Sequence, residues 1–170
     1  IQAGETMTLE ELLYCALVSS ANEACNAIAE YISGDISAFV DLMNSTASSI
    51  GCKNTHFANT HGLPNENHYT TASDLALIME TAMTYSEFLK IIGTAKHTVP
   101  ATNMSEERQL TSTNLLINES NRNYYSPCIG GKTGHTEAAG YCLVSAAEKD
   151  GIHLISVVLK TKSEIAADGT

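Results

Sequence analysis

Hydrophobic positions recur every three to four residues through the first half of the chain, which is the period of a helix packed on one side. The first such stretch follows Thr8-x-x-Glu11, a capping box, and predicts a helix directly after it. Polar residues interrupt the pattern at 18–22. A second helix is predicted to begin near Glu23 and to stop at Gly34, because glycine readily adopts the left-handed conformation that ends helices.

Three more helices are predicted further along the chain. One covers about residues 37–50, another follows the capping pair Thr71 and Asp74, and a short one covers about residues 86–92. Residues 52–69 contain Asn, His, Gly and Pro without a period, which predicts a long loop.

The second half of the chain has the pattern of strands. Residues 94–100 are predicted as a strand, and residues 101–123 as polar, irregular chain. Two apolar, β-branched stretches then flank Asp150-Gly151, a dipeptide typical of tight hairpin turns. We therefore expect the chain to end in an antiparallel sheet.

Helices followed by an antiparallel sheet indicate an α+β fold. We expect a helical lobe at about residues 7–93 and a sheet-forming part at about 94–160, within one domain that includes residues 1–170. Residues 1–6 have the pattern of a loop with no element before it, and residues 160–170 run from a strand into small and polar residues. We therefore expect a fragment that is incomplete at both ends.

Composition excludes several classes of protein. With 170 residues, 44 % of them hydrophobic, the chain can bury a core, and its net charge of −10 repels the phosphates of nucleic acids. Apolar stretches are far shorter than the ~20 residues of a membrane span. His56 and His61 lie among turn-forming residues, and no H-E-x-x-H or C-x-x-C occurs, so we expect neither metal nor cofactor. The five widely spaced cysteines are expected to be mostly small, buried side chains.

Lys132-Thr133-Gly134 stands directly before the predicted hairpin. A lysine ammonium on an edge strand attracts a substrate carboxylate, a threonine hydroxyl donates a hydrogen bond, and a glycine allows close approach of a ligand. The backbone N–H that follows, that of His135, can form half of an oxyanion hole. Alone, such a triplet is a weak signal that occurs by chance in many proteins. Its position directly before a hairpin favours an acyl-transfer site.

Ser20-Ala21-Asn22 lies between two predicted helices and has the form of a Ser-x-Asn motif. Serine and asparagine also cap helices well, and Glu23 opens a helix here, so an ordinary N-cap is an alternative interpretation. The two interpretations are compatible, because a capping residue can still direct its side chain into a cleft.

Together these motifs resemble those of the low-molecular-mass penicillin-binding proteins of the serine D-Ala-D-Ala carboxypeptidase type. The resemblance implies the penicillin-binding protein and β-lactamase-like transpeptidase fold. The similar segments occur in the same order over most of the chain: residues 12–30, 57–63, 69–76, 113–116, 131–136 and 139–144.

The resemblance implies a serine acyl-enzyme mechanism in the cell envelope, outside the cytoplasm. In this family a serine attacks the penultimate D-alanine of a peptidoglycan stem peptide, the terminal D-alanine leaves, and water hydrolyses the ester. β-Lactams acylate the same serine. By similarity, Ser20 would relay a proton to the leaving amine and Asn22 would hold the substrate amide. Lys132 and Thr133 would bind the terminal carboxylate.

Lys132 and Thr133 are called the carboxylate clamp below. The resemblance assigns further roles to residues next to this clamp. Gly134 would allow close approach of the substrate, and Thr136 is an additional carboxylate candidate. His135 would act through its backbone N–H, so its ring need not be catalytic. His61 is expected to be a structural loop residue.

One family motif is missing from the sequence. No serine of the chain is followed three residues later by lysine, so the Ser-x-x-Lys nucleophile motif is absent. We therefore expect the chain to be inactive alone, and to dimerise or exchange strands through exposed sheet edges. Gly130-Gly131 replaces a bulkier residue and is expected to loosen the edge strand, and neither arginine of the chain lies near the clamp in sequence.

Two other functions remain alternatives. A class A β-lactamase shares Lys-Thr-Gly, but no segment resembles the E-x-x-L-N that would hold its deacylating glutamate. A non-catalytic peptidoglycan-binding homologue would keep the cleft without the nucleophile, and the sequence does not separate it from a truncated enzyme.

Overall fold

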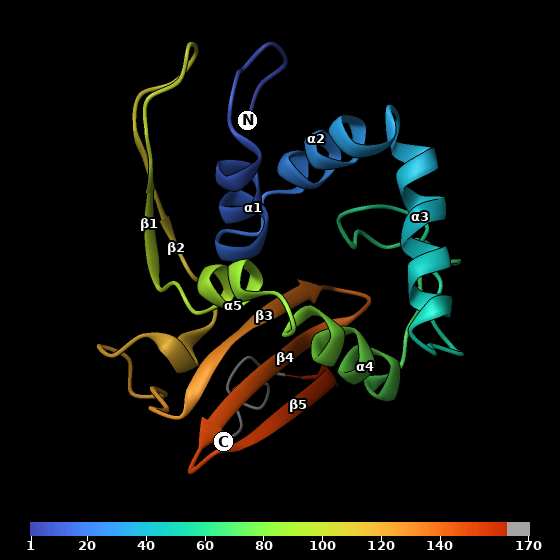
Figure 1. Ribbon diagram of the computed structural model, residues 1–170, viewed down its shortest axis with the longest axis vertical. Coiled ribbons are helices and arrows are strands. Elements are labelled where there is room, and N and C mark those ends of the chain that lie inside the picture. Colours follow the sequence, from blue (N-terminus) through green and yellow to red (C-terminus); the bar gives the residue numbers. More distant parts are fainter. Residues whose placement is uncertain (163–170) are drawn as a thin grey trace.

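The structure, a computed structural model, describes residues 1–162 (Figure 1). Its helices are α1 (Leu9–Val18), α2 (Asn22–Ser33), α3 (Ile36–Ser49), α4 (Ala72–Ala82) and α5 (Ser86–Ile92). Its strands are β1 (Lys96–Val99), β2 (Arg108–Thr111), β3 (Cys128–Thr136), β4 (Gly140–Lys149) and β5 (Ile152–Thr161), with a 3₁₀ turn, η1 (Leu115–Ile117).

The predicted helix boundaries agree with the structure to within about a residue. Thr8 Oγ1 accepts a hydrogen bond from Glu11 N at 3.2 Å, and α2 ends at Gly34, whose φ is 83°. The Glu11 carboxylate, the other half of the predicted capping box, lies 2.9 Å from His97 Nε2 in β1. The first helix is thus tied both to its own first turn and to the β1–β2 ribbon.

The β part contains two antiparallel sheets. β3, β4 and β5 form one in that order, and Asp150 and Gly151, both with positive φ (53° and 78°), make the predicted hairpin turn between β4 and β5. β1 pairs with β2 in a separate ribbon. The expectation that residues 101–123 are irregular is wrong in part, because β2 and η1 lie there. β2 is short and buries only Leu110, so its pattern is too weak to predict a strand.

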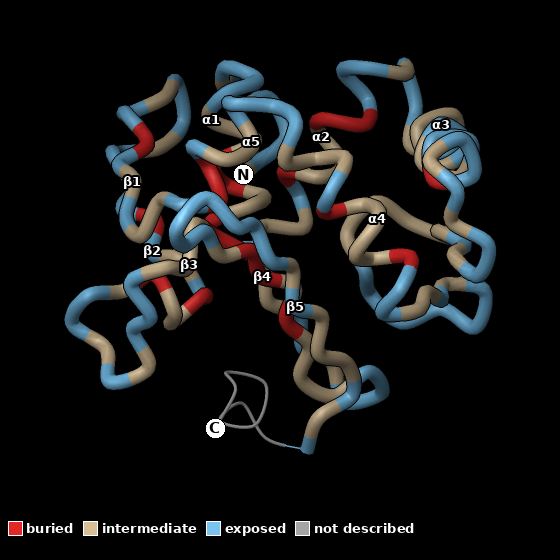
Figure 2. The backbone as a smooth tube through the Cα atoms, turned by 60° about the horizontal axis from the view of Figure 1, so that its bottom comes forward, coloured by how far each residue is buried: buried red, intermediate tan, exposed pale blue. Residues whose placement is uncertain are grey.

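The three-stranded sheet packs one face against the helices. Val144 and Ala146 of β4 and Ile155 of β5 pack together with Met79 of α4 and Ile92 of α5. Figure 2 shows buried positions concentrated where α1, α5 and β4 meet, whereas α3 stands apart and is largely exposed. This packing makes β3 the sheet edge nearest to the helices α1 and α5.

The opposite face of the sheet is hollowed. Leu143 and Ala147 of β4 and Leu154 and Val158 of β5 line a hollow of about 580 Å³. Leu154 is 66 % exposed, so a large apolar side chain faces solvent there. Within residues 1–162, no helix has the length and apolar content of a membrane-spanning segment.

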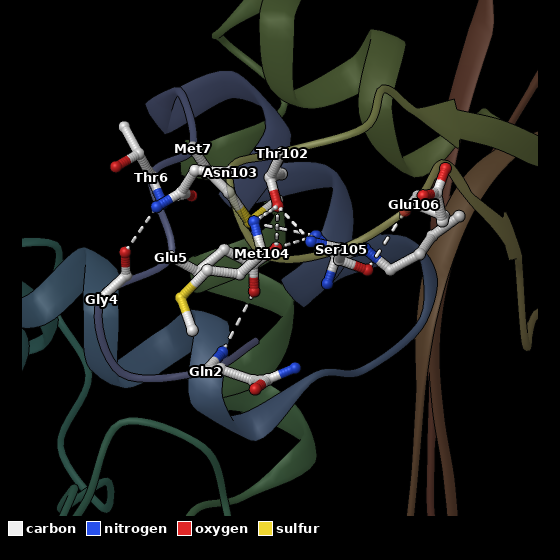
Figure 3. A network of polar contacts seen from close by, with 11 residues as sticks. Gln2, Gly4, Glu5, Thr6, Met7, Thr102, Asn103, Met104, Ser105 and Glu106 are labelled. Atoms are coloured by element: carbon white, nitrogen blue, oxygen red, sulfur yellow. Dashed lines mark hydrogen bonds and ion pairs between the residues drawn. The ribbon is translucent and has the colours of Figure 1, made fainter.

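Residues 2–7 are bound to the loop between β1 and β2 (Figure 3). The Glu5 side chain is buried, and its Oε1 accepts hydrogen bonds from Thr102 Oγ1 at 2.8 Å and Arg108 Nη2 at 2.5 Å. Thr6 N donates to Asn103 Oδ1 at 2.8 Å. The hydrogen bond from Thr102, ahead of Arg108, holds the pKa of Glu5 below its ordinary value. These contacts fix the start of α1, and so the helix that leads to Ser20.

The five cysteines are all free thiols. Cys15 is buried, but the other four are only half-buried, so the expectation that most are buried is wrong. Cys25, Cys52 and Cys128 lie at element ends or on faces that the neighbouring elements cover incompletely.

Candidate active site

Ser20 lies in the sharp connection between α1 and α2, at residues 19–21. Its φ is 61°, in the left-handed region that costs a non-glycine residue about 1–2 kcal/mol. The turn is held by Cys15 O, which accepts hydrogen bonds from Ala21 N at 3.0 Å and Ser19 Oγ at 2.9 Å. The strained backbone therefore presents Ser20 as an exposed side chain at a fixed point.

The N-cap interpretation of this motif is wrong. Ala21 occupies the N-cap position of α2 without a side-chain hydrogen bond, and Asn22 is the first helical residue. Ser20 instead accepts a hydrogen bond from Lys132 Nζ, a residue 112 positions away in sequence. The tertiary structure, and not local helix capping, determines the place of the Ser20 hydroxyl.

Lys132 lies on the edge strand β3 and joins the two halves of the chain. Its Nζ also donates to Thr133 O at 2.8 Å, so two of the three ammonium protons have partners. Among the described residues no partner takes the third, which is free for a ligand. Burial lowers the pKa of Lys132, and the Cys25 thiol acts in the opposite direction.

Helix α2 brings Asn22 and Cys25 to the same region. The Asn22 side chain makes no hydrogen bond within residues 1–162, so its amide can bind a ligand. Cys25 follows three positions later, on the same helix face, and is close enough to Lys132 for its charge to act on the thiol. Burial nevertheless raises the pKa of Cys25. The sequence analysis gave no sign that Cys25 lies near Lys132, because the two residues are far apart in the chain.

Thr133 has a partner that no motif predicted. Its Oγ1 lies 2.5 Å from Oγ1 of Thr113, in the segment between β2 and η1. Thr113 belongs to a segment that resembles the family, but no role followed from that resemblance. Only the folded chain brings these two hydroxyls together.

The remaining predicted residues lie along β3 and its turn. Gly134 has open space, since a Cβ placed there would meet nothing closer than Cys142 Cβ at 3.9 Å. The ring of His135 stacks on Tyr141 at a centroid distance of 4.0 Å. Thr136 Oγ1 accepts a hydrogen bond from Ala139 N at 3.0 Å, so this hydroxyl is engaged in the β3–β4 turn.

Gly130 and Gly131 lie where neighbouring elements approach the edge strand closely. A Cβ on Gly130 would lie 2.6 Å from Ile92 Cγ1, and one on Gly131 would lie 2.5 Å from Val144 O. The register of β3 shifts between Cys128 and Gly130, and the expectation that the glycine pair loosens this strand stays a prediction. The two glycines let α5 and β4 approach closely and so fix the position of Lys132, which follows them directly.

His61 takes part in its own loop: its Nδ1 lies 3.3 Å from Leu63 N, which donates to it. Over the described part of the chain, no group of three or more His, Cys, Asp or Glu side chains is arranged to hold a metal ion.

Comparison with known proteins identifies a family. The family model for D-alanyl-D-alanine carboxypeptidases matches residues 1–163. The chain is 37 % identical over 158 residues to the D-alanyl-D-alanine carboxypeptidase DacF of Bacillus subtilis, covering 93 % of this chain and 39 % of DacF. It is 35 % identical over 159 residues to DacA of Escherichia coli, covering 94 % of this chain and 37 % of DacA. The chain thus spans well under half the length of these relatives.

Solved structures show the same fold. The DD-transpeptidase of Streptomyces K15 superposes with a TM-score of 0.90 at 31 % identity, covering 99 % of this chain and 66 % of that one. A D-alanyl-D-alanine carboxypeptidase of Mycobacterium tuberculosis superposes with a TM-score of 0.86 at 28 % identity, covering 99 % and 64 %. The α+β fold expected from the sequence is confirmed as that of penicillin-binding proteins. On both sequence and structure, the chain belongs to the D-alanyl-D-alanine carboxypeptidase family.

Proposed function

We propose that the whole protein is a serine-type D-Ala-D-Ala carboxypeptidase and that this chain supplies its substrate-binding side. The observation that carries the proposal is the hydrogen bond from Lys132 Nζ to Ser20 Oγ. It joins the two sequence motifs, from opposite halves of the chain, at one point. A chance pair of motifs would have no reason to meet there.

The substrate in this proposal is a peptidoglycan stem peptide that ends in D-Ala-D-Ala. The Lys132 ammonium attracts its terminal carboxylate, and the Thr133 hydroxyl donates a hydrogen bond to it. The free amide of Asn22 holds the peptide amide, and Ser20, in contact with Lys132, passes a proton to the leaving amine. β-Lactams, which present a carboxylate beside a reactive amide, bind in the same place.

Gly134 and His135 contribute backbone in this proposal. The open space over Gly134 lets the substrate lie close to β3, and the N–H of His135 stabilises the oxyanion. The stacked ring of His135 takes no part in proton transfer. Thr136, with its hydroxyl engaged by Ala139 N, supports the turn and contacts the carboxylate less directly than Thr133.

The nucleophile of the proposed enzyme lies outside these 170 residues, because no Ser-x-x-Lys occurs among them. A site without its nucleophile forms no acyl-enzyme. We therefore expect no covalent band when the chain is incubated with a fluorescent penicillin, and a band with the whole protein. A labelled band from the chain would contradict the assignment of the nucleophile.

A non-catalytic peptidoglycan-binding protein is the second candidate, since the clamp is complete without a nucleophile in the chain. Labelling of the whole protein separates the two candidates. A whole protein that binds D-Ala-D-Ala peptides but never acquires the fluorescent penicillin would be a binding protein.

We further propose that residues 1–170 belong to one catalytic domain and that the protein acts in the cell envelope, where its substrate lies. The open sheet face, with Ile152 and Leu154 63 % and 66 % exposed, supports association of the isolated chain as a dimer or by strand exchange. Light scattering should give a mass above that of the monomer, and Leu154→Glu should lower it. A clean monomer at high concentration would contradict this.

A further inference from the structure

A second threonine hydroxyl lies beside that of Thr133. Thr113 Oγ1 is 2.5 Å from Thr133 Oγ1, and Thr113 comes from outside the Lys-Thr-Gly triplet. Thr113 is exposed and Thr133 half-buried, on an edge strand with no neighbour on that side within the sheet. A ligand carboxylate at Thr133 is therefore within reach of the hydroxyl pair.

The backbone on both sides of Thr113 is fixed. Ser112 N donates to Ala95 O at 2.8 Å, beside the β1–β2 ribbon. Asn114 is only 1 % exposed, and a Cβ on Gly131 would lie 3.1 Å from its Nδ2, so Asn114 packs directly against β3. The Thr113 hydroxyl is thus held near Thr133 by neighbours that have no contact with the ligand.

A pair of hydroxyls contains two protons, and the bond between them uses one. We propose that Thr113 is a positioning residue of the carboxylate site: its hydroxyl donates to Thr133 Oγ1, so that the Thr133 proton is directed at the C-terminal carboxylate of the peptide. The donated bond also polarises the Thr133 hydroxyl and strengthens it as a donor. This inference rests on the proposed function of Lys132 and Thr133.

No guanidinium within residues 1–162 is placed to make this contact. The chain has two arginines. Arg108 is paired with the buried Glu5 at 2.5 Å, and Arg122 lines the hollow against β4 and β5. Within the described residues, one ammonium and the hydroxyl pair are therefore the groups that can bind the carboxylate, which makes the orientation of the Thr133 proton important for affinity.

Thr113→Val removes the hydroxyl and keeps the shape of the side chain, and Thr113→Ser keeps the hydroxyl. The chain and both variants are titrated by NMR with an N-acetylated peptide ending in D-Ala-D-Ala and with its C-terminal amide. Thr113→Val should bind the acid about tenfold more weakly, the effect of one hydrogen bond to a charged group, and the amide with unchanged affinity. Thr113→Ser should restore binding of the acid. In a Thr133→Val background, Thr113→Val should have no further effect.

The two proposals fail in different ways. If the unmodified chain binds acid and amide equally, the carboxylate site itself is wrong. If the unmodified chain prefers the acid and the Thr113→Val variant has the same preference, the proposed role of Thr113 is wrong and the carboxylate site stands. The same conclusion follows if Thr113→Val weakens the binding of both peptides equally.

Discussion

Replacement of Gly131 by alanine tests how tightly β3 is held beneath Lys132. The added Cβ would lie 2.5 Å from Val144 O, 2.9 Å from Ser145 Cα and 3.1 Å from Asn114 Nδ2. Two of these atoms are backbone of the paired strand and cannot move aside alone, so we expect the upper part of the overpacking range, about 2–3 kcal/mol. The reduced freedom of the unfolded chain offsets about 0.4–1 kcal/mol. The free energy of unfolding should therefore fall by about 2 kcal/mol.

The assay is urea unfolding followed by circular dichroism, with Gly134→Ala as the matched control. Gly134 lies three residues along the same strand, and its added Cβ meets nothing closer than 3.9 Å. Gly134→Ala should thus be as stable as the unmodified chain or more stable by about 0.4–1 kcal/mol. If Gly131→Ala unfolds at the same urea concentration as Gly134→Ala, the close packing of β3 is wrong.

Three further predictions concern backbone strain and charge. In urea unfolding, Ser20→Gly should be more stable than Ser20→Ala by roughly 0.5–1 kcal/mol. Both variants lose the hydroxyl, but only alanine keeps the energetic cost of the positive φ of 61°. Equal stabilities of the two variants would contradict the left-handed turn. The hydrogen bond from Thr55 is the main cause that lowers the pKa of the buried Asp74. The ionised Asp74 therefore stabilises the fold above the unfolded pKa of about 3.9, and this stabilisation is lost as the pH falls through the lower folded pKa. Urea midpoints should therefore fall more steeply below about pH 4 for the unmodified chain than for Asp74→Asn, and parallel curves would refute this. Burial lowers the pKa of Lys132 from its ordinary 10.5, so the ammonium should lose its proton below that pH. The affinity for a D-Ala-D-Ala peptide should therefore decline as the pH rises through this lowered pKa. An affinity that stays constant up to pH 10.5 would contradict the burial of the ammonium.

Local signals predicted most of the helices and the last hairpin. Thr8 and Thr71 cap their helices as expected, because a threonine hydroxyl can accept from a backbone N–H three residues on without help from the rest of the fold. Asp150 and Gly151 likewise turn the chain through their own preference for positive φ. β2 was missed because a four-residue strand with one buried side chain depends on its pairing with β1, which is a long-range contact.

The site residues could be proposed from their motifs, but their environments could not. Ser20 and Asn22 look like capping residues in sequence. The folded chain separates the two interpretations, because Ala21 holds the N-cap position of α2 and Ser20 contacts Lys132. The pairing of Thr113 with Thr133 has no local signal, since the two residues are 20 positions apart in sequence. Tertiary packing decides both, and resemblance to the family supplies the order of motifs without their distances.

The central claim is that the two halves of the chain form one binding site around Lys132. Its most direct test is an NMR titration of the 170-residue chain with a peptide ending in D-Ala-D-Ala, following the backbone signals of Ser20, Asn22, Lys132 and Thr133, with the L-Ala-L-Ala peptide as control. We predict that signals from both halves shift along one saturable curve with a single Kd, and that the control peptide leaves them unchanged. Shifts confined to one half, or equal shifts with both peptides, would contradict the account.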